Sequence, residues 1–354
     1  MAEATSAAQA MAEDPRARRA PLKIDLALQG GGSHGALTWG VLDRLLEEPW
    51  IEIEAISGTS AGAMNAAVLA HGMAVGGREA ARAALEDFWR RVSRAATFSP
   101  FQRAPIDRLR GSWSLDNSPG FIAMDLMARL VSPYAVGGAG NPMRDILAAV
   151  IDFDRLAAGP VRLFITATNV HTGRGRVFRN HEITPDVLLA SACLPTMFQA
   201  IEIDGEPYWD GGFSGNPTLT PLIRESDARD VVLVQINPVA RPETPRTARD
   251  IASRVNEVSF NAVLLKELRM IAVLRQVVDA GQGEGARWAR MRIHRIHSAM
   301  MNDLGESSKL NAEWAFLTML RDEGRRTAAA FGRDHRADIG TRSTFDLDEL
   351  LEGV

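Results

Sequence analysis

A serine between two glycines, in the order Gly58-Thr59-Ser60-Ala61-Gly62, has the spacing of a nucleophile elbow. In such an elbow a strand turns sharply into a helix, and glycine tolerates the close backbone approaches because it has no Cβ. An apolar run ends at Ile56, and an alanine-rich helix is expected over 61–73. The pattern therefore predicts that the Ser60 hydroxyl stands at the tip of a turn. The helix N-terminus below it would favour negative charge.

A glycine-rich run precedes this serine, in the order Gly30-Gly31-Gly32-Ser33-His34-Gly35. It follows a predicted strand over 23–29 and opens a predicted helix that ends near 48. Two kinds of chemistry fit. The bare N–H groups of such a turn can face Ser60 as an oxyanion hole. The same glycines also match the dinucleotide fingerprint, with Glu52 or Glu54 near the position of a ribose-binding acid. The continuation of the next strand into Ser60 favours the oxyanion hole.

An exposed carboxylate is predicted at the end of a hairpin. The segment 201–210 alternates as two short strands that turn at Asp204-Gly205, and it ends in Asp210-Gly211-Gly212. A new helix is expected to start around Phe213 to Pro217. Asp210 is therefore a candidate functional carboxylate at a strand end.

The remaining reactive side chains give no further site. The single cysteine, Cys193, excludes an internal disulfide and a cysteine-rich zinc site, and its type predicts a small buried residue. His171 and His181 are expected in loops. His294 and His297 would point to opposite faces of a strand, which makes them a poor metal pair. We expect no metal site and no cofactor.

Bulk composition limits the class of protein. The chain has 354 residues, of which 46% are hydrophobic, enough for one large α/β domain with an appendage or for two domains. Proteins that bind nucleic acid usually carry an excess of positive charge. This chain has a net charge of −4, so we exclude nucleic-acid binding. The first 21 residues lack the apolar core of a signal peptide, and no apolar run reaches spanning length. These features predict a cytoplasmic protein and leave peripheral membrane contact open.

The predicted elements alternate between strands and helices, which is typical of a parallel sheet. The apolar run over 230–236 predicts a strand buried on two faces. The proline- and glycine-rich region over 95–140 is interpreted as a cap with adaptable apolar side chains. Further strands are expected over 161–169, 173–178 and 291–296. Further helices are expected over 78–92, 143–150, 185–193, 246–280 and 310–331.

The glycine turn, the serine elbow and the Asp-Gly-Gly turn occur in this order, each at a strand end. Together they resemble the patatin-like phospholipase family of acyl hydrolases, over roughly residues 24–236. The resemblance implies a three-layer α/β/α fold with a mostly parallel central sheet and a helical cap. It implies a disordered tail over 1–21, a catalytic domain over 22–240 and a mainly helical C-terminal extension over 241–354, as in some bacterial members.

The resemblance also implies a mechanism, a Ser-Asp dyad without a catalytic histidine. Ser60 would attack an ester of a phospholipid or another acyl lipid, and Asp210 would accept its proton. The oxyanion hole would come from Gly30, Gly31, Gly32 and Ser33. The supporting residues would be His34, Gly35, Gly58, Gly62, Gly211 and Gly212.

One position departs from the family pattern, because His34 stands where the family often has arginine or lysine. A fixed positive charge at the hole is therefore not implied, and His34 could donate only when suitably protonated. A nucleotide-binding regulatory protein that uses Gly30–Gly35 as a phosphate loop is the alternative function, and a scaffold with a degenerate site is a third. The apolar stripe over 246–280 predicts internal packing first, and a homo-oligomer interface or a membrane face second.

Overall fold

The computed structural model describes residues 21–135, 141–278 and 283–351. The tail predicted over 1–21 therefore lies outside the described residues, apart from Pro21, and so does the end of the predicted cap. At the centre is an eight-stranded sheet in the order β5-β6-β3-β2-β1-β7-β8, with β4 paired to β3. Its strands are β1 (Leu22–Leu28), β2 (Ile51–Gly58), β3 (Arg162–Asn169), β4 (Gly175–Arg179), β5 (Ile201–Ile203), β6 (Glu206–Asp210), β7 (Asp230–Val234) and β8 (Arg292–Ile296).

The middle of the sheet is parallel, from β3 through β2, β1 and β7 to β8. Strands β4, β5 and β6 pair antiparallel at one side. The register aligns Leu28 at the end of β1 with Gly58 of β2 and Val234 of β7. The carboxyl ends of three parallel strands therefore meet at one edge, which is where α/β sheets bind ligands.

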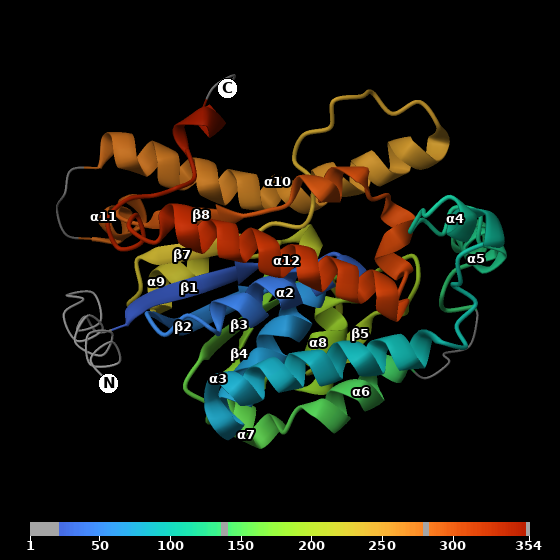
Figure 1. Ribbon diagram of the computed structural model, residues 1–354, viewed down its shortest axis with the longest axis horizontal. Coiled ribbons are helices and arrows are strands. Elements are labelled where there is room, and N and C mark those ends of the chain that lie inside the picture. The colour runs from blue at the N-terminus through green and yellow to red at the C-terminus, as the bar shows by residue number, and fades with distance from the viewer. Residues whose placement is uncertain (1–20, 136–140, 279–282, 352–354) are drawn as a thin grey trace, which may run out of the picture.

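Alternating side chains divide the core into two layers. On β1, Leu26 and Leu28 join one hydrophobic cluster and Ala27 joins the other. The helices follow this division, and Figure 1 shows them on opposite sides of the sheet. One layer holds α2 (Gly35–Leu45), α3 (Ala61–Ala96), α6 (Pro142–Val150), α7 (Phe153–Ala157), α8 (Pro185–Ser191) and α12 (Trp314–His335), and the other holds α9 (Thr220–Glu225), α10 (Ala248–Val277) and α11 (Glu284–Ala289). The predicted α/β/α fold is confirmed.

The helices expected over 61–73 and 78–92 are both present within α3, on either side of a kink where Gly76 and Gly77 leave helical geometry. One expectation for a helix needs correction. The helix expected at Phe213 is wrong: a single 3-10 turn follows Asp210, and α9 begins only at Thr220. The chain between them turns at a cis Asn216-Pro217 bond, and the Asn216 side chain contacts the glycine-rich loop.

The region predicted as a cap contains two short helices at one end of the molecule, α4 (Pro105–Leu109) and α5 (Pro119–Leu130) (Figure 1). No residue of α5 is buried, although the helix carries apolar side chains such as Leu126 and Leu130. The cap therefore exposes apolar surface.

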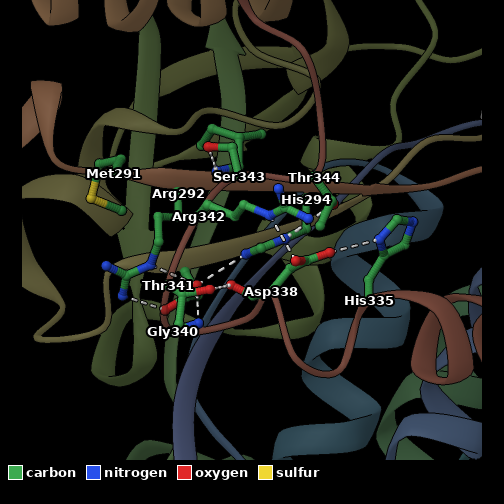
Figure 2. Close-up of polar contacts among 12 residues, drawn as sticks. Met291, Arg292, His294, His335, Asp338, Gly340, Thr341, Arg342, Ser343 and Thr344 are labelled. Carbon is green, nitrogen blue, oxygen red and sulfur yellow. Dashed lines mark hydrogen bonds and ion pairs between the residues drawn. The ribbon is translucent and has the colours of Figure 1, made fainter.

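The C-terminal part is attached to the sheet through β8, which pairs with β7. Buried Asp230 on β7 accepts two hydrogen bonds from Arg292, at 2.9 and 2.6 Å. It also contacts Nε2 of His294 at 3.0 Å and accepts from the N–H of Gly340 at 2.8 Å. Figure 2 shows Arg292 and His294 of β8 beside Gly340 and the other labelled residues of the segment after α12. The segment predicted as an extension thus supplies a strand of the central sheet.

Candidate active site

Ser60 lies at the turn from β2 into α3, with φ of 55° and ψ of −123°. Such a conformation is rare for a residue with a Cβ and is typical of a strained functional turn. The glycines on either side allow the turn to close: a Cβ on Gly62 would lie 2.2 Å from the carbonyl oxygen of Leu28, and one on Gly58 would lie 2.7 Å from that of Gly62. The N–H of Ser60 donates to Ser191 Oγ at 3.0 Å. The elbow predicted from the glycine spacing is present.

Asp210 lies at the end of β6 and is 2% exposed. Its Oδ1 accepts a 2.7 Å hydrogen bond from the N–H of Gly212, and the Ser60 side chain lies close enough to the carboxylate to lower its pKa. The structure thus brings together two residues that are 150 positions apart. Burial raises the pKa of Asp210 to about 7, against the opposing effects of the Gly212 N–H, the Ser60 side chain and the charge of Lys309.

Close packing explains the two glycines after Asp210. A Cβ on Gly211 would lie 2.0 Å from the carbonyl oxygen of Thr166. A Cβ on Gly212 would lie 1.9 Å from the ring of Phe260 on α10. The Asp-Gly-Gly sequence is therefore required by the tight approach of β3 and α10 to this turn.

The glycine-rich loop lies directly beside Ser60, because a Cβ on Gly30 would lie 2.6 Å from Ser60 Cβ. The N–H of Gly30 donates to Asn216 Oδ1 at 2.7 Å. Within the described residues, by contrast, no acceptor is found for the N–H groups of Gly31 and Gly32. These two glycines open the short 3-10 turn Gly32–His34 that leads into α2. Of the four predicted oxyanion residues, Gly30 therefore has its N–H engaged elsewhere.

A buried network of amide side chains holds this loop, and sequence reasoning missed it. Gln29 Nε2 donates to Asn261 Oδ1 on α10 at 3.1 Å, and its Oε1 accepts from the N–H of Ile236 at 3.0 Å. Asn237 Nδ2 donates to the carbonyl oxygen of Gly30 at 2.7 Å. The only sequence signal was the presence of amides directly after β1 and β7, where parallel strands end.

His34 is 3% exposed, and its Nε2 lies 2.7 Å from Ser308 Oγ. Burial, with smaller contributions from the charges of Lys309 and Arg241, lowers the pKa of His34 well below its ordinary value. The ring is therefore neutral at pH 7 and supplies no fixed charge to the loop. Its hydroxyl partner comes from the segment Glu306–Leu310, which sequence reasoning did not connect to the site.

Several other predictions concern residues near the site. Cys193 is buried as expected, and burial raises the pKa of its thiol to about 12. Its carbonyl oxygen accepts from the N–H of Asp210 at 2.8 Å. Among the described residues there is no group of three or more His, Cys, Asp or Glu side chains that could hold a metal ion. None of the helices in the described ranges is long and apolar enough to cross a membrane.

Comparison with known proteins gives one family and several solved structures. The chain is similar to VipD from Legionella pneumophila, at 14% identity and a TM-score of 0.35, covering 86% of this chain and 67% of VipD. It is similar to the type III effector protein ExoU, at 16% identity and a TM-score of 0.28, covering 88% of this chain and about half, 52%, of ExoU. The complex of SpcU with ExoU from Pseudomonas aeruginosa matches at 18% identity and a TM-score of 0.24, covering 94% of this chain and 67% of that one. A search of curated proteins gave no match. The family model for patatin-like phospholipase matches residues 26–223, more than half of the chain, and the protein therefore belongs to the patatin-like phospholipase family.

Proposed function

We propose that the protein is a serine acyl hydrolase that cleaves ester bonds of phospholipids or other acyl lipids. Membership of the family supports lipid hydrolysis in general. The observation that carries the specific proposal is the buried Asp210 carboxylate close to the side chain of Ser60, which itself lies beside the glycine-rich loop. A nucleophile, a base and a set of backbone donors are the parts that acyl transfer needs.

In this proposal Ser60 Oγ attacks the ester carbonyl while Asp210 takes its proton. The oxyanion that forms accepts hydrogen bonds from the N–H groups of Gly31 and Gly32, and Ser33 lies next to them in the turn. Asp210 then gives the proton to the departing alcohol. Water then attacks the acyl-enzyme while Asp210 takes its proton. Asp210 returns this proton to Ser60 Oγ as the fatty acid leaves.

Burial makes Asp210 a better base than an ordinary aspartate. A carboxylate with a pKa of about 3.9 is a weak base for a serine hydroxyl. With its pKa raised to about 7, Asp210 is ionised in about half of the molecules at neutral pH and accepts a proton more readily than an ordinary aspartate. The desolvated site therefore supports a dyad without histidine.

Exposed apolar side chains support a lipid as substrate. Helix α5 exposes Leu126 and Leu130, and Phe213 beside the Asp-Gly-Gly turn is 41% exposed. We propose that the cap side contacts the lipid, by peripheral attachment to a membrane. Helix α10 exposes Val255 and Val258, and this face is the candidate for a homo-oligomer contact.

Labelling with a fluorophosphonate serine probe tests the proposal, using wild type, Ser60→Ala and Asp210→Asn. We expect an adduct on Ser60 in the wild type and none in Ser60→Ala. We also expect both variants to lose turnover of p-nitrophenyl esters and of a phospholipid panel while remaining folded. Wild-type turnover in Ser60→Ala would exclude the assignment. Absence of labelling together with submicromolar nucleotide binding by calorimetry would favour the phosphate-loop alternative.

A further inference from the structure

The C-terminal segment Glu306–Leu310 packs against the glycine-rich loop, although the two are some 270 residues apart. A Cβ on Gly32 would lie 2.4 Å from the carbonyl oxygen of Lys309 and 3.3 Å from its Cβ. Gly32 itself has φ of +56°, a conformation that favours glycine. Together with the contact between His34 and Ser308, this fixes the segment against two positions of the loop. The side chain of Lys309 therefore starts directly beside the proposed oxyanion hole.

The segment is also fixed from its other side. Ser307 is buried, and its Oγ accepts a 3.1 Å hydrogen bond from the N–H of Leu115 in the cap region. Asn311 Nδ2 donates to the carbonyl oxygen of Trp113 at 3.0 Å. The segment is thus held between the cap and the loop, so the position of Lys309 is defined by contacts on two sides.

Lys309 is an unusual residue in this chain, since only three of its 40 basic residues are lysines. Its side chain is 18% exposed, and its Nζ lies 2.8 Å from Glu306 Oε2. A partly buried ammonium interacts more strongly with nearby charges than an exposed one does, because water screens it less.

Several charged groups lie around Lys309, and they differ in whether another cation already neutralises them. Glu257 on α10 is already paired with Arg241, at 2.5 Å, and with Arg254, at 3.0 Å. The charge of Lys309 reaches Asp210, whose pKa it lowers, and His34, whose pKa it also lowers. The charge of Lys309 also lowers the pKa of Glu257, and His34 is neutral, so within the proposed catalytic pair Asp210 is the anion that this charge stabilises.

We infer that Lys309 is a positioning residue of the active site, whose ammonium keeps Asp210 in its anionic, proton-accepting form and supplies the positive charge that the glycine-rich loop lacks at His34. This inference rests on the proposed function. It assigns the segment Glu306–Leu310 a role in the chemistry, because this segment places the Lys309 ammonium next to the glycine-rich loop Gly30–Gly35.

The test is the pH profile of kcat/KM for a neutral ester, p-nitrophenyl butyrate, in full-length wild type, Lys309→Met, Lys309→Arg and Lys266→Met. In Lys309→Met we expect kcat at pH 7 to fall about 10- to 100-fold with little change in KM. We also expect the acidic limb of the profile, the rise of kcat/KM with pH, to move its midpoint toward higher pH by about half a pH unit to one pH unit. Lys309→Arg should restore most of the activity. Lys266 is an exposed lysine on α10, so Lys266→Met should match the wild type.

A second variant keeps the inference open to test if Lys309→Met fails to fold. Glu306→Gln removes the negative partner of Lys309 and should move the acidic limb toward lower pH, opposite to Lys309→Met. The inference would be overturned if the wild type is active and the folded variants keep the acidic side of its pH profile at the same pH. That result would leave the proposed function standing. A wild type that hydrolyses no ester and is not labelled at Ser60 would overturn both.

Discussion

The side chain of Asn216 accepts a 2.7 Å hydrogen bond from the backbone N–H of Gly30. This contact connects the turn that follows Asp210 to the loop that faces Ser60, across a separation of 186 residues. The contact also orients the loop. It fixes the direction of the Gly30 N–H and so limits the directions in which the N–H groups of Gly31 and Gly32 can point. The position of the proposed oxyanion hole therefore depends on a residue outside the three glycine-bounded patterns.

Replacing Asn216 with alanine tests this dependence. The change leaves the N–H of Gly30 buried without an acceptor, which should cost about 1–3 kcal/mol of unfolding free energy. The loop should also lose its alignment, and we expect kcat for p-nitrophenyl esters to fall about 10- to 100-fold. Asn141→Ala is the matched control, since Asn141 accepts from the N–H of Met143 at the start of α6, remote from Ser60. It should cost about 1 kcal/mol and leave kcat unchanged. Equal kcat in the two variants would contradict the proposed alignment.

Activity should depend on pH through Asp210. A base must be ionised, so kcat/KM for a neutral ester should rise with pH through a midpoint of about 7, where burial places the pKa of Asp210. Steady-state assays between pH 5 and 9 measure the midpoint. A midpoint near 4 would mean that Asp210 behaves as an ordinary exposed carboxylate and would argue against the desolvated dyad.

The raised pKa of Asp210 also predicts a cost in stability. A carboxyl group whose pKa is higher in the folded state contributes stability below its unfolded pKa of about 3.9, and this is lost as pH rises through about 7. Asp210→Asn removes the buried charge, so at pH 8 we expect it to be more stable than wild type by about 1–4 kcal/mol. Urea denaturation at pH 5 and pH 8 measures the difference, which should be smaller at pH 5. Ser60→Ala retains Asp210 and should retain the pH dependence.

The contact between β7 and β8 predicts a stability effect of opposite sign. Asp230 is buried and paired with Arg292. Burial alone would raise its pKa, but hydrogen bonds with Arg292, His294 and the N–H of Gly340, together with the charge of Arg292, hold the pKa of Asp230 well below its usual range. A depressed carboxyl pKa contributes stability above about pH 4, and this is lost as pH falls further. Asp230→Asn breaks a buried pair and should cost about 3–5 kcal/mol at pH 7.

An exposed ion pair provides the control for Asp230. Asp125 lies 3.0 Å from Arg129 on α5, with side chains 38% and 53% exposed. Asp125→Asn should cost less than about 1 kcal/mol. A cost for Asp230→Asn as small as this would show that the pair does not anchor β8 to the sheet.

Local sequence was sufficient to predict the main elements of the fold and two of the residues that meet in the site. Glycine at 58 and 62 limits the backbone to a sharp turn, so the conformation around Ser60 follows from residues within that turn. The apolar run over 230–236 predicted a buried parallel strand, which is β7. The helix start near Phe213 was wrong because the chain there follows the contact of Asn216 with Gly30, which is not local.

The sequence by itself determined which residues are candidates for the chemistry and which turns present them, because these depend on residue type and short-range backbone sterics. Only the tertiary structure decided their electrostatic state. The pKa of Asp210 depends on its burial, the neutrality of His34 depends on its burial beside Ser308, and the charge of Lys309 lowers the pKa of both. These properties arise where segments distant in sequence exclude water and bring charges together. They cannot be predicted from neighbouring residues alone.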